Sequence, residues 1–375
     1  MIYFDNGATS YPKPTSVIRS SYDAIKNYSF NIGRSGYRYS LKSAEKIYTV
    51  RESIANMFSF KPENVVFTKN CTEALNIAIL GSVNKGDHII ISSLEHNSVS
   101  RVVQSLYDNG VCDYDIARFS FDKEECITNF KMLIKRNTRL IICMYASNVF
   151  GVTFPIKEIG ELCSQYGIRF IVDAAQGAGI ADINAVRDNI DILCAPGHKC
   201  LFGPMGTGFM AVKEGVLLKP YSFGGTGSNS LSLKQPDFLP DRFESGTLNN
   251  SGIIALGKGI EFINTTGIEN IYNHDLSLAQ YMYDYLSSIP EAELYTPRPD
   301  KSFMPIISFN YKDYSSEKTA ALLSEYDICT RAGYHCSPLA HKHFNTLERG
   351  TVRLSMGYFN TVSDCYKFFN IVKKL

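Results

Sequence analysis

The residue whose chemistry stands out first is Lys199, which follows an apolar segment over 191–194 and precedes a glycine-rich turn over 203–208. A lysine at the end of a buried strand is poorly solvated, and burial disfavours the charged form of its amine. A neutral lysine amine is a nucleophile that can form a Schiff base with an aldehyde cofactor or a carbonyl substrate. Most lysines in such segments are simply solvated, so Lys199 alone is a weak signal.

A carboxylate upstream strengthens this interpretation. Asp173 ends another apolar segment over 168–172. A lysine for the Schiff base and a carboxylate for the pyridinium nitrogen are the two groups that pyridoxal-phosphate chemistry demands. Together, Asp173 and Lys199 therefore predict a site for pyridoxal 5′-phosphate (PLP).

Other polar residues could serve the same cofactor. The turn over 69–73 leads from a candidate strand into a helical pattern, and the N–H groups of a helix start bind phosphate. Thr72 would add a donor there, although an ordinary helix cap explains the same residues. His96 ends another candidate strand, where a lone histidine is more often structural than catalytic. Asn148 and Gln176 lie in segments that also suit turns.

Two residues near the C-terminus could react with or bind a substrate. Cys336 lies in a polar turn flanked by Arg331, His335 and His341, and nearby positive charge lowers the pKa of a thiol. The turn alone gives even odds of a reactive thiol. Arg353 interrupts an apolar candidate strand. A buried guanidinium needs an anionic partner, which is either a structural carboxylate or the carboxylate of a substrate.

Composition excludes several classes of function. The 375 residues carry a net charge of +1 without a long basic run, so nucleic acid is not an expected partner. The ten cysteines include no Cys-x-x-Cys pair, which makes a zinc or disulfide framework improbable. No apolar stretch reaches the roughly 20 residues of a membrane helix, and no signal pattern begins the chain. We therefore expect a soluble cytoplasmic protein that does not bind a membrane.

The elements that must position these residues alternate along the first 215 residues. Apolar runs predict strands at 65–68, 88–91, 140–143, 170–172 and 191–193, and helical spacing predicts helices at 99–107 and 156–166. This alternation favours a mainly parallel sheet with helices on both faces. Such sheets bind ligands at the carboxyl ends of their strands, where Thr68, Asp173 and Gly197 lie.

Beyond residue 222 the pattern changes. Gly, Ser, Asn and Pro cluster over 222–250, which predicts a long functional loop before a helix over 252–264. The remaining segments predict a smaller α+β domain. Its expected helices cover 268–288 and 316–325, and its expected strands cover 305–309 and 352–355.

Several separated motifs resemble those of the class V, fold-type I PLP enzymes. Within that class the chain is similar to the cysteine desulfurase and selenocysteine lyase family. The resemblance implies an α/β fold with a mainly parallel, seven-stranded-type sheet and a smaller α+β C-terminal domain. It also implies a large PLP-binding domain over 15–250 and a small domain made of 1–14 and 251–375. The motifs, in chain order, are 5–9, 173–176, 197–199, 243–247 and Arg353.

The resemblance also assigns a role to each cofactor residue. Thr72, the backbone of Cys71 and His198 would hold the phosphate, and Lys199 would form the Schiff base. His96 would stack on the ring and relay protons. Asn148 and Gln176 would contact the phenolic oxygen, and Asp173 the ring nitrogen. Thr247 would reach the phosphate of a partner subunit, which implies a homodimer. The residues so assigned are Cys71, Thr72, His96, Asn148, Asp173, Gln176, His198, Lys199 and Thr247.

On the substrate side, the resemblance implies L-cysteine as the substrate. Arg353 would clamp its α-carboxylate, with Arg331 and Ala8 nearby. Lys199 would remove the α-proton, and Cys336 would take the sulfur as a persulfide and leave L-alanine. An acceptor protein or thiol would then collect the sulfur.

Departures from the family pattern leave alternatives open. Pro196 replaces a hydroxyl residue that contacts the phosphate in many relatives, and Tyr37 and Tyr334 stand where close relatives often have histidines. The alternatives are a selenocysteine lyase, a cysteine-sulfinate desulfinase, another class V aminotransferase, or a catalytically idle scaffold. The sequence does not decide between sulfur and selenium, name the acceptor, or show whether the Cys336 loop moves.

Overall fold

A seven-stranded sheet forms the centre of the computed structural model, which describes residues 1–32 and 36–375. Its strand order is β2-β8-β7-β6-β5-β3-β4. Most neighbouring pairs run parallel, and β8 is antiparallel to both β7 and β2. The predicted mainly parallel α/β sheet is therefore confirmed. The strands are β2 (Val65–Thr68), β3 (Asp87–Ser92), β4 (Cys112–Ala117), β5 (Thr138–Met144), β6 (Arg169–Asp173), β7 (Ile192–Pro196) and β8 (Gly208–Val212).

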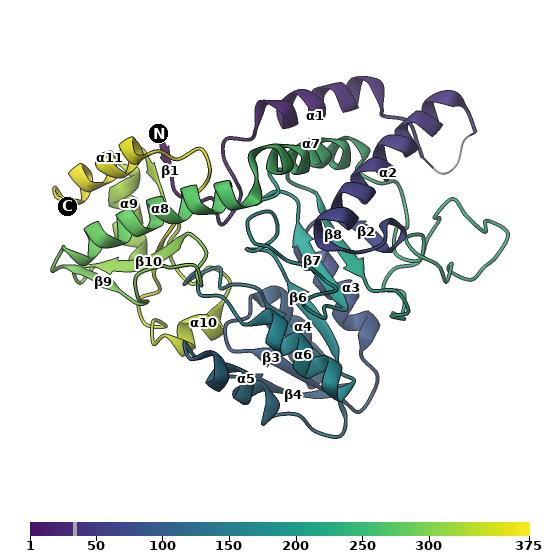
Figure 1. Cartoon of the computed structure of the whole chain (residues 1–375), viewed down its shortest axis with the longest axis horizontal. Helices are drawn as coiled ribbons and strands as arrows, with labels where there is room; N and C mark the ends of the chain where they lie inside the picture. Colours follow the sequence, from purple (N-terminus) through teal and green to yellow (C-terminus); the bar gives the residue numbers. More distant parts are fainter. Residues whose placement is uncertain (33–35) are drawn as a thin grey trace.

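Helices cover both faces of this sheet (Figure 1). They are α2 (Arg38–Phe58), α3 (Cys71–Ser82), α4 (Asn97–Asp108), α5 (Lys123–Lys131), α6 (Ile156–Tyr166) and α7 (Asn250–Thr266), with a short 3-10 turn at Pro62–Asn64. Helix α1 (Thr15–Asn27) packs against α7. Successive strand residues point to opposite faces. Accordingly, Ile89 and Ile91 join the core under α3 and α4, whereas Ile90 joins the core under α2 and α6. This explains why the strands read as continuous apolar runs.

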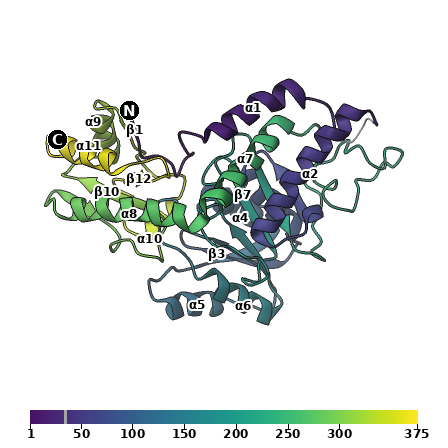
Figure 2. The same ribbon diagram turned by 45° about the horizontal axis from the view of Figure 1, so that its top comes forward.

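The C-terminal third forms a smaller α+β unit that also holds both termini (Figures 1 and 2). One sheet has the order β12-β10-β9, and β1 pairs with β11 in a second. No helix in residues 1–32 and 36–375 has the length and apolar character to cross a membrane. The division at residues 14 and 250 stays a prediction. The elements are β1 (Ile2–Tyr3), α8 (Ile268–Ser287), β9 (Ala292–Leu294), β10 (Ile306–Tyr311), α9 (Ser316–Ser324), β11 (Ile328–Cys329), α10 (Pro338–His343), β12 (Val352–Ser355) and α11 (Val362–Val372).

Strand β8 does not follow from the sequence pattern, because its first residue continues a glycine-rich turn. Gly208 pairs with Thr68 at the end of β2. A Cβ atom on Gly208 would lie 2.8 Å from the backbone carbon of Asn70. Glycine at this position therefore lets β8 pack directly against the turn that begins α3.

The predicted long loop is present, since residues 213–249 contain neither helix nor strand. A buried ion pair anchors its end to the large sheet. The Arg51 guanidinium on α2 donates to both carboxylate oxygens of Glu244, at 2.7 Å each. Oε1 of Glu244 also accepts the N–H of Phe67 in β2 at 2.7 Å. This pair thus fixes the segment that leads into Thr247.

We expect Arg51→Met to lower the free energy of unfolding by about 3–5 kcal/mol, because it leaves the Glu244 carboxylate buried without its cation. The double variant Arg51→Met/Glu244→Leu should recover most of this loss, since it removes both charges. Urea denaturation followed by circular dichroism measures both values. A single variant as stable as the wild type would show that the pair contributes nothing to the fold.

Candidate active site

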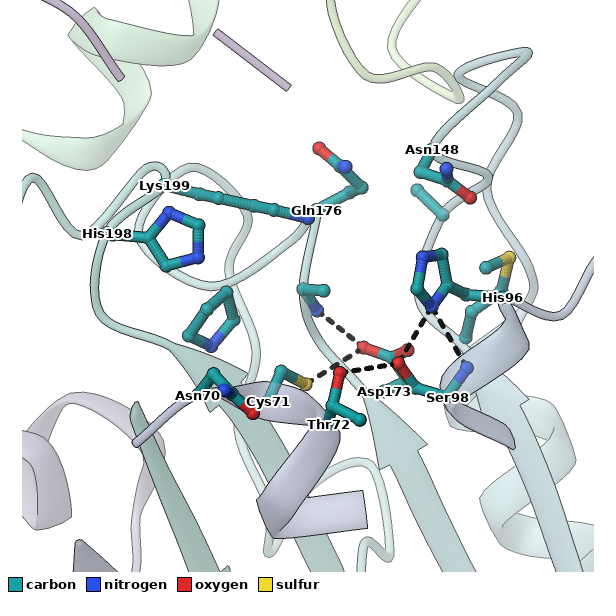
Figure 3. A pocket seen from close by; sticks show the side chains of 14 residues that line it. Asn70, Cys71, Thr72, His96, Ser98, Asn148, Asp173, Gln176, His198 and Lys199 are labelled. Atoms are coloured by element: carbon teal, nitrogen blue, oxygen red, sulfur yellow. Dashed lines mark hydrogen bonds between the residues drawn. The ribbon is translucent and has the colours of Figure 1, made fainter. Parts of the chain in front are cut away.

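The carboxyl ends of β2, β5, β6 and β7 border one pocket. A turn with polar side chains follows each of these strands. The four turns lie together because parallel strands end at a common edge of the sheet. Eight of the predicted cofactor-binding residues line this pocket (Figure 3), namely Cys71, Thr72, His96, Asn148, Asp173, Gln176, His198 and Lys199.

Lys199 extends into the pocket from one side, and His96 and Asn148 lie on the other (Figure 3). Burial lowers the pKa of the Lys199 amine, and the charge of Asp173 opposes this in part. Asp173 is 3% exposed, and burial raises the pKa of its carboxyl group. Neither group has an ion-pair partner within residues 1–32 and 36–375. The pocket therefore brings to one cavity an amine whose pKa is lowered and a carboxyl group whose pKa is raised, without an ion pair between them.

Two donors hold Asp173 in place. Its Oδ1 accepts the N–H of Ala175 at 2.8 Å and the Sγ–H of Cys71 at 3.4 Å. Burial and Asp173 together raise the pKa of the Cys71 thiol well above its usual range, so Cys71 acts here as a neutral donor. The fixed carboxyl group suits a partner with a buried N–H, such as a pyridinium nitrogen.

The start of helix α3 and His198 form another part of the pocket lining. The side chain of Asn70 caps α3 by accepting the N–H of Glu73 at 2.9 Å, which leaves Cys71 and Thr72 in the first turn. Nδ1 of His198 is buried and has no partner among the described residues. These groups fit the phosphate of PLP, because an anion would satisfy both the helix start and the orphaned nitrogen. Pro196 also lines the pocket and offers no donor.

His96 is fixed as a neutral ring. Its Nδ1 accepts the N–H of Ser98 at 3.1 Å, and the Ser98 hydroxyl lies 2.8 Å from both Nδ1 of His96 and Oγ1 of Thr72. Burial, then the charges of Lys199 and three arginines, lower the pKa of His96 to about 4. A neutral ring facing the pocket is suited to stacking on an aromatic cofactor, as predicted from the resemblance.

Asn148 holds the loop that carries Cys336. Its Nδ2 donates to the carbonyl of His335 at 2.8 Å, and its Oδ1 accepts the hydroxyl of Ser337 at 2.7 Å. The carbonyl of Cys336 itself accepts the N–H of Asn97 at 2.7 Å. Two hydrogen bonds to backbone carbonyls and one from the Ser337 hydroxyl thus hold the residues on both sides of the thiol. The role of Asn148 toward a phenolic oxygen stays a prediction.

Cys336 is the exposed cysteine of the chain, whereas the other nine are buried or partly buried. It lines a groove beside the pocket, and Thr72, His96 and Ser98 border both. One basis for predicting its reactivity is wrong. Burial lowers the pKa of His335 to about 2 and that of His341 to about 4, so neither ring carries positive charge beside the thiol at neutral pH.

Arg353 in β12 is 1% exposed and already paired. Its Nη2 lies 2.5 Å from Oδ1 of Asp5, and its Nη1 donates to the carbonyl of Asn148 at 2.8 Å. Nε is buried without a partner in the described chain. Arg353 therefore forms a structural salt bridge with Asp5. Its role as a substrate clamp stays a prediction, in which the carboxylate of the substrate would bind Arg353 together with Asp5.

The remaining predicted substrate residues lie around this arginine. A Cβ atom on Gly7 would be 3.2 Å from Cζ of Arg353, so the chain passes close to the guanidinium before Ala8. The carbonyl of Gly7 accepts Nε2 of Gln176 at 3.1 Å. The backbone of Arg331 pairs with that of Arg353. Residues from both chain ends therefore meet beside the pocket.

Thr247 and the two tyrosines that depart from the family pattern line neither the pocket nor the groove. Thr247 is exposed and lines other surface hollows, so its contact with a partner's phosphate stays a prediction. The Tyr334 hydroxyl donates to the carbonyl of Leu347 at 2.8 Å, and Tyr37 precedes α2 and packs near Phe30. Neither tyrosine is among the described residues that line the pocket or the groove.

Sequence reasoning missed the residues that orient the predicted ones. Ser98 lies in the first turn of α4, whose N-cap is His96, and it gave no separate signal in the sequence. Asp5 and Ser337 had no local signal, since each acts on a residue that is far away in the chain. Glu95, which is fully buried, accepts the hydroxyl of Ser92 at 2.6 Å and the N–H of Met144 at 2.8 Å.

Comparison with known proteins agrees with this geometry. The model of the class-V aminotransferase family matches residues 2–368. The chain therefore belongs to the class-V aminotransferase family, whose enzymes use PLP. Its fold is the fold-type I architecture predicted from the motifs, with TM-score 0.92 to the solved apo structure of a cysteine desulfurase from Thermococcus onnurineus NA1. That structure is 30% identical and covers 100% of this chain and 95% of its own.

Curated relatives narrow the comparison further. A probable cysteine desulfurase from Methanothermobacter thermautotrophicus is 32% identical, over 96% of this chain and 91% of the relative. A probable cysteine desulfurase from Borreliella burgdorferi is 31% identical, over 100% of this chain and 92% of the relative. The similarity thus extends across both the large and the small unit.

Glu95 gives the site a measurable pH dependence. Burial raises the pKa of its carboxyl group from 4.5 to about 8, so the folded chain holds a proton that the unfolded chain has released. The contribution of this proton to the free energy of unfolding is fully present below pH 4.5 and is lost as the pH rises toward 8. Between pH 5.5 and 7.5, wild-type stability should fall by about 2–3 kcal/mol more than that of Glu95→Gln.

Urea unfolding of both proteins across this range measures the difference. Gln keeps the acceptor for Ser92 and Met144, so it is a matched control that cannot ionise. Parallel pH profiles for the two proteins would contradict a neutral Glu95.

Proposed function

We propose that this chain is a PLP-dependent cysteine desulfurase that converts L-cysteine to L-alanine and leaves the sulfur as a persulfide on Cys336. The observation that carries the proposal is the arrangement of an exposed thiol, on a loop fixed by Asn148, beside a pocket that contains Lys199 and Asp173. The cysteine desulfurase relatives support the same reaction class.

The chain's own residues suit each part of binding. Thr72 and His198 would hold the phosphate, Asp173 the ring nitrogen, and His96 the ring face. When bound, PLP supplies an electron sink for the α-carbon of the substrate. Arg353 would hold the substrate carboxylate, because its buried guanidinium keeps Nε unpaired. The residues present therefore fit the cofactor that the family uses.

Proton and sulfur transfer follow from position and pKa. Burial favours the neutral amine of Lys199, so that amine can remove the α-proton of the substrate. The Cys336 thiolate attacks the substrate sulfur, a sulfur–sulfur bond forms, and the bond between that sulfur and Cβ breaks. Protonation of the remaining carbon skeleton gives alanine. The two sulfur atoms stay on the chain as a persulfide, and an acceptor must remove the outer one.

Cys336→Ser should reduce alanine formation from cysteine by at least about a hundredfold, because it removes the nucleophile for sulfur. Cofactor absorbance should not change, since Cys336 does not line the cofactor pocket. Mass spectrometry of the wild type after incubation with cysteine should find one added sulfur, on Cys336. Cys329→Ser is the control and should keep both the added sulfur and the activity. Full desulfuration by Cys336→Ser would contradict the proposal.

Ser337→Ala should lower kcat for alanine formation about tenfold with little change in KM, because Asn148 loses the bond that fixes one side of the thiol. Amide hydrogen exchange over 333–337 should become faster in the same variant, with or without cofactor. Tyr334→Phe removes an exposed bond of the same loop and is the control. Unchanged exchange and kcat in Ser337→Ala would show that the Asn148 contact does not position Cys336.

A further inference from the structure

The groove beside Cys336 has a regular construction. Asn76 and Leu80 follow Thr72 at four-residue spacing on α3, and Arg101 and Ser105 follow Asn97 at the same spacing on α4. Each helix therefore contributes one face over two turns, about 12 Å at 1.5 Å per residue. The volume of the groove is about 490 Å³, within the range of small-molecule sites.

The thiol lies at one end of this groove. Asn97 begins α4 and holds the carbonyl of Cys336 through its N–H at 2.7 Å, so Cys336 sits where α4 starts. Thr72, in the first turn of α3, borders the same end. A molecule in the groove would therefore meet the thiol at the end where both helices begin.

The charge in the groove is of one sign. Arg101 is exposed and has no ion-pair or hydrogen-bond partner in residues 1–32 and 36–375. None of the described residues that line the groove is a carboxylate. The positive charge of Arg101 also helps to lower the pKa of His96. The starts of α3 and α4 add partial positive charge at the thiol end. The groove thus favours an anion.

We propose that this groove binds the sulfur acceptor and that the acceptor is a small thiol carrying a carboxylate. The inference rests on the proposed persulfide of Cys336. Arg101 follows Asn97 by four residues, about 6 Å along α4. The acceptor sulfur would lie beside Cys336 and its carboxylate one helical turn away, at Arg101. Leu80 and Val102 supply apolar contact for the carbon atoms between them.

The transfer step is balanced without an added oxidant. The acceptor thiolate attacks the outer sulfur of the persulfide, and a new sulfur–sulfur bond forms on the acceptor. The bond between the outer sulfur and Cys336 breaks, and Cys336 leaves as a thiolate. The acceptor departs as a small persulfide, and the Cys336 thiolate is ready for the next substrate.

The test uses thiol exchange on a Cys336 disulfide made chemically, which does not depend on desulfuration. Full-length protein is treated with dithiodipyridine, and mass spectrometry confirms the mixed disulfide on Cys336. Release of the pyridine thione is followed by absorbance with mercaptosuccinate, an anionic thiol, and with thioglycerol, a neutral one. For each thiol, the ratio of wild-type to variant rate cancels its intrinsic reactivity.

We expect Arg101→Gln to slow exchange with mercaptosuccinate at least fivefold and exchange with thioglycerol less than twofold. Arg101→Glu should slow the anionic thiol further, and added salt should reduce the wild-type preference. Arg136→Gln is the control, because Arg136 is an exposed arginine just before the opposite end of β5. It should change neither rate.

Equal effects on the two thiols, or none, would overturn the inference. Such a result would leave a protein acceptor, or the substrate's own entry path, as the use of the groove. A different result would contradict the proposed desulfurase activity alone. In that case incubation with cysteine leaves no sulfur on Cys336, while exchange on the chemical disulfide still prefers the anionic thiol.

Discussion

A lysine amine and a carboxyl group that share a cavity without pairing set the main constraint on this structure. Both Lys199 and Asp173 are desolvated, and desolvation shifts each pKa toward the neutral form. Adjacent parallel strands β6 and β7 deliver them, since Asp173 is in register with Cys194 and Lys199 follows β7 by three residues. A sheet covered on both faces holds these two groups at the same edge and shields them from water.

The N-terminal segment completes this arrangement. The hydroxyl of Thr9 and the amine of Lys13 donate to the carbonyl of His198 at 3.0 and 2.6 Å, and the hydroxyl of Ser10 donates to that of Lys199 at 2.9 Å. Asp5 pairs with Arg353 a few residues earlier. One short stretch therefore connects the lysine turn of the large unit to the arginine strand of the small one. The two units meet at the site because the first residues of the chain bind both.

The sequence predicted those features that depend on local pattern. The strands over 65–68 and 170–172 and the helix over 156–166 were predictable from the spacing of apolar residues, and Lys199 and Asp173 from their places at strand ends. Features set by distant contacts were not. The pairing of Arg353 with Asp5 joins residues 348 positions apart, and the neutral state of His335 follows from burial that only the fold creates. Strand β8 was hidden because Gly208 reads as part of the glycine-rich turn before it, and only the fold shows that its close approach to Asn70 requires a glycine.

The backbone conformation at Cys336 has a consequence of its own. His335 and Cys336 both have positive φ, at 49° and 58°, a region that residues other than glycine rarely occupy, with asparagine, aspartate and histidine as the more frequent exceptions. A side chain at each position raises the energy of the folded loop by about 1 kcal/mol or more. Glycine at 336 would adopt this conformation without that strain, although it would also raise the conformational entropy of the unfolded chain. The sulfur-carrier role proposed for Cys336 would therefore place a side chain at a position where the backbone conformation disfavours one.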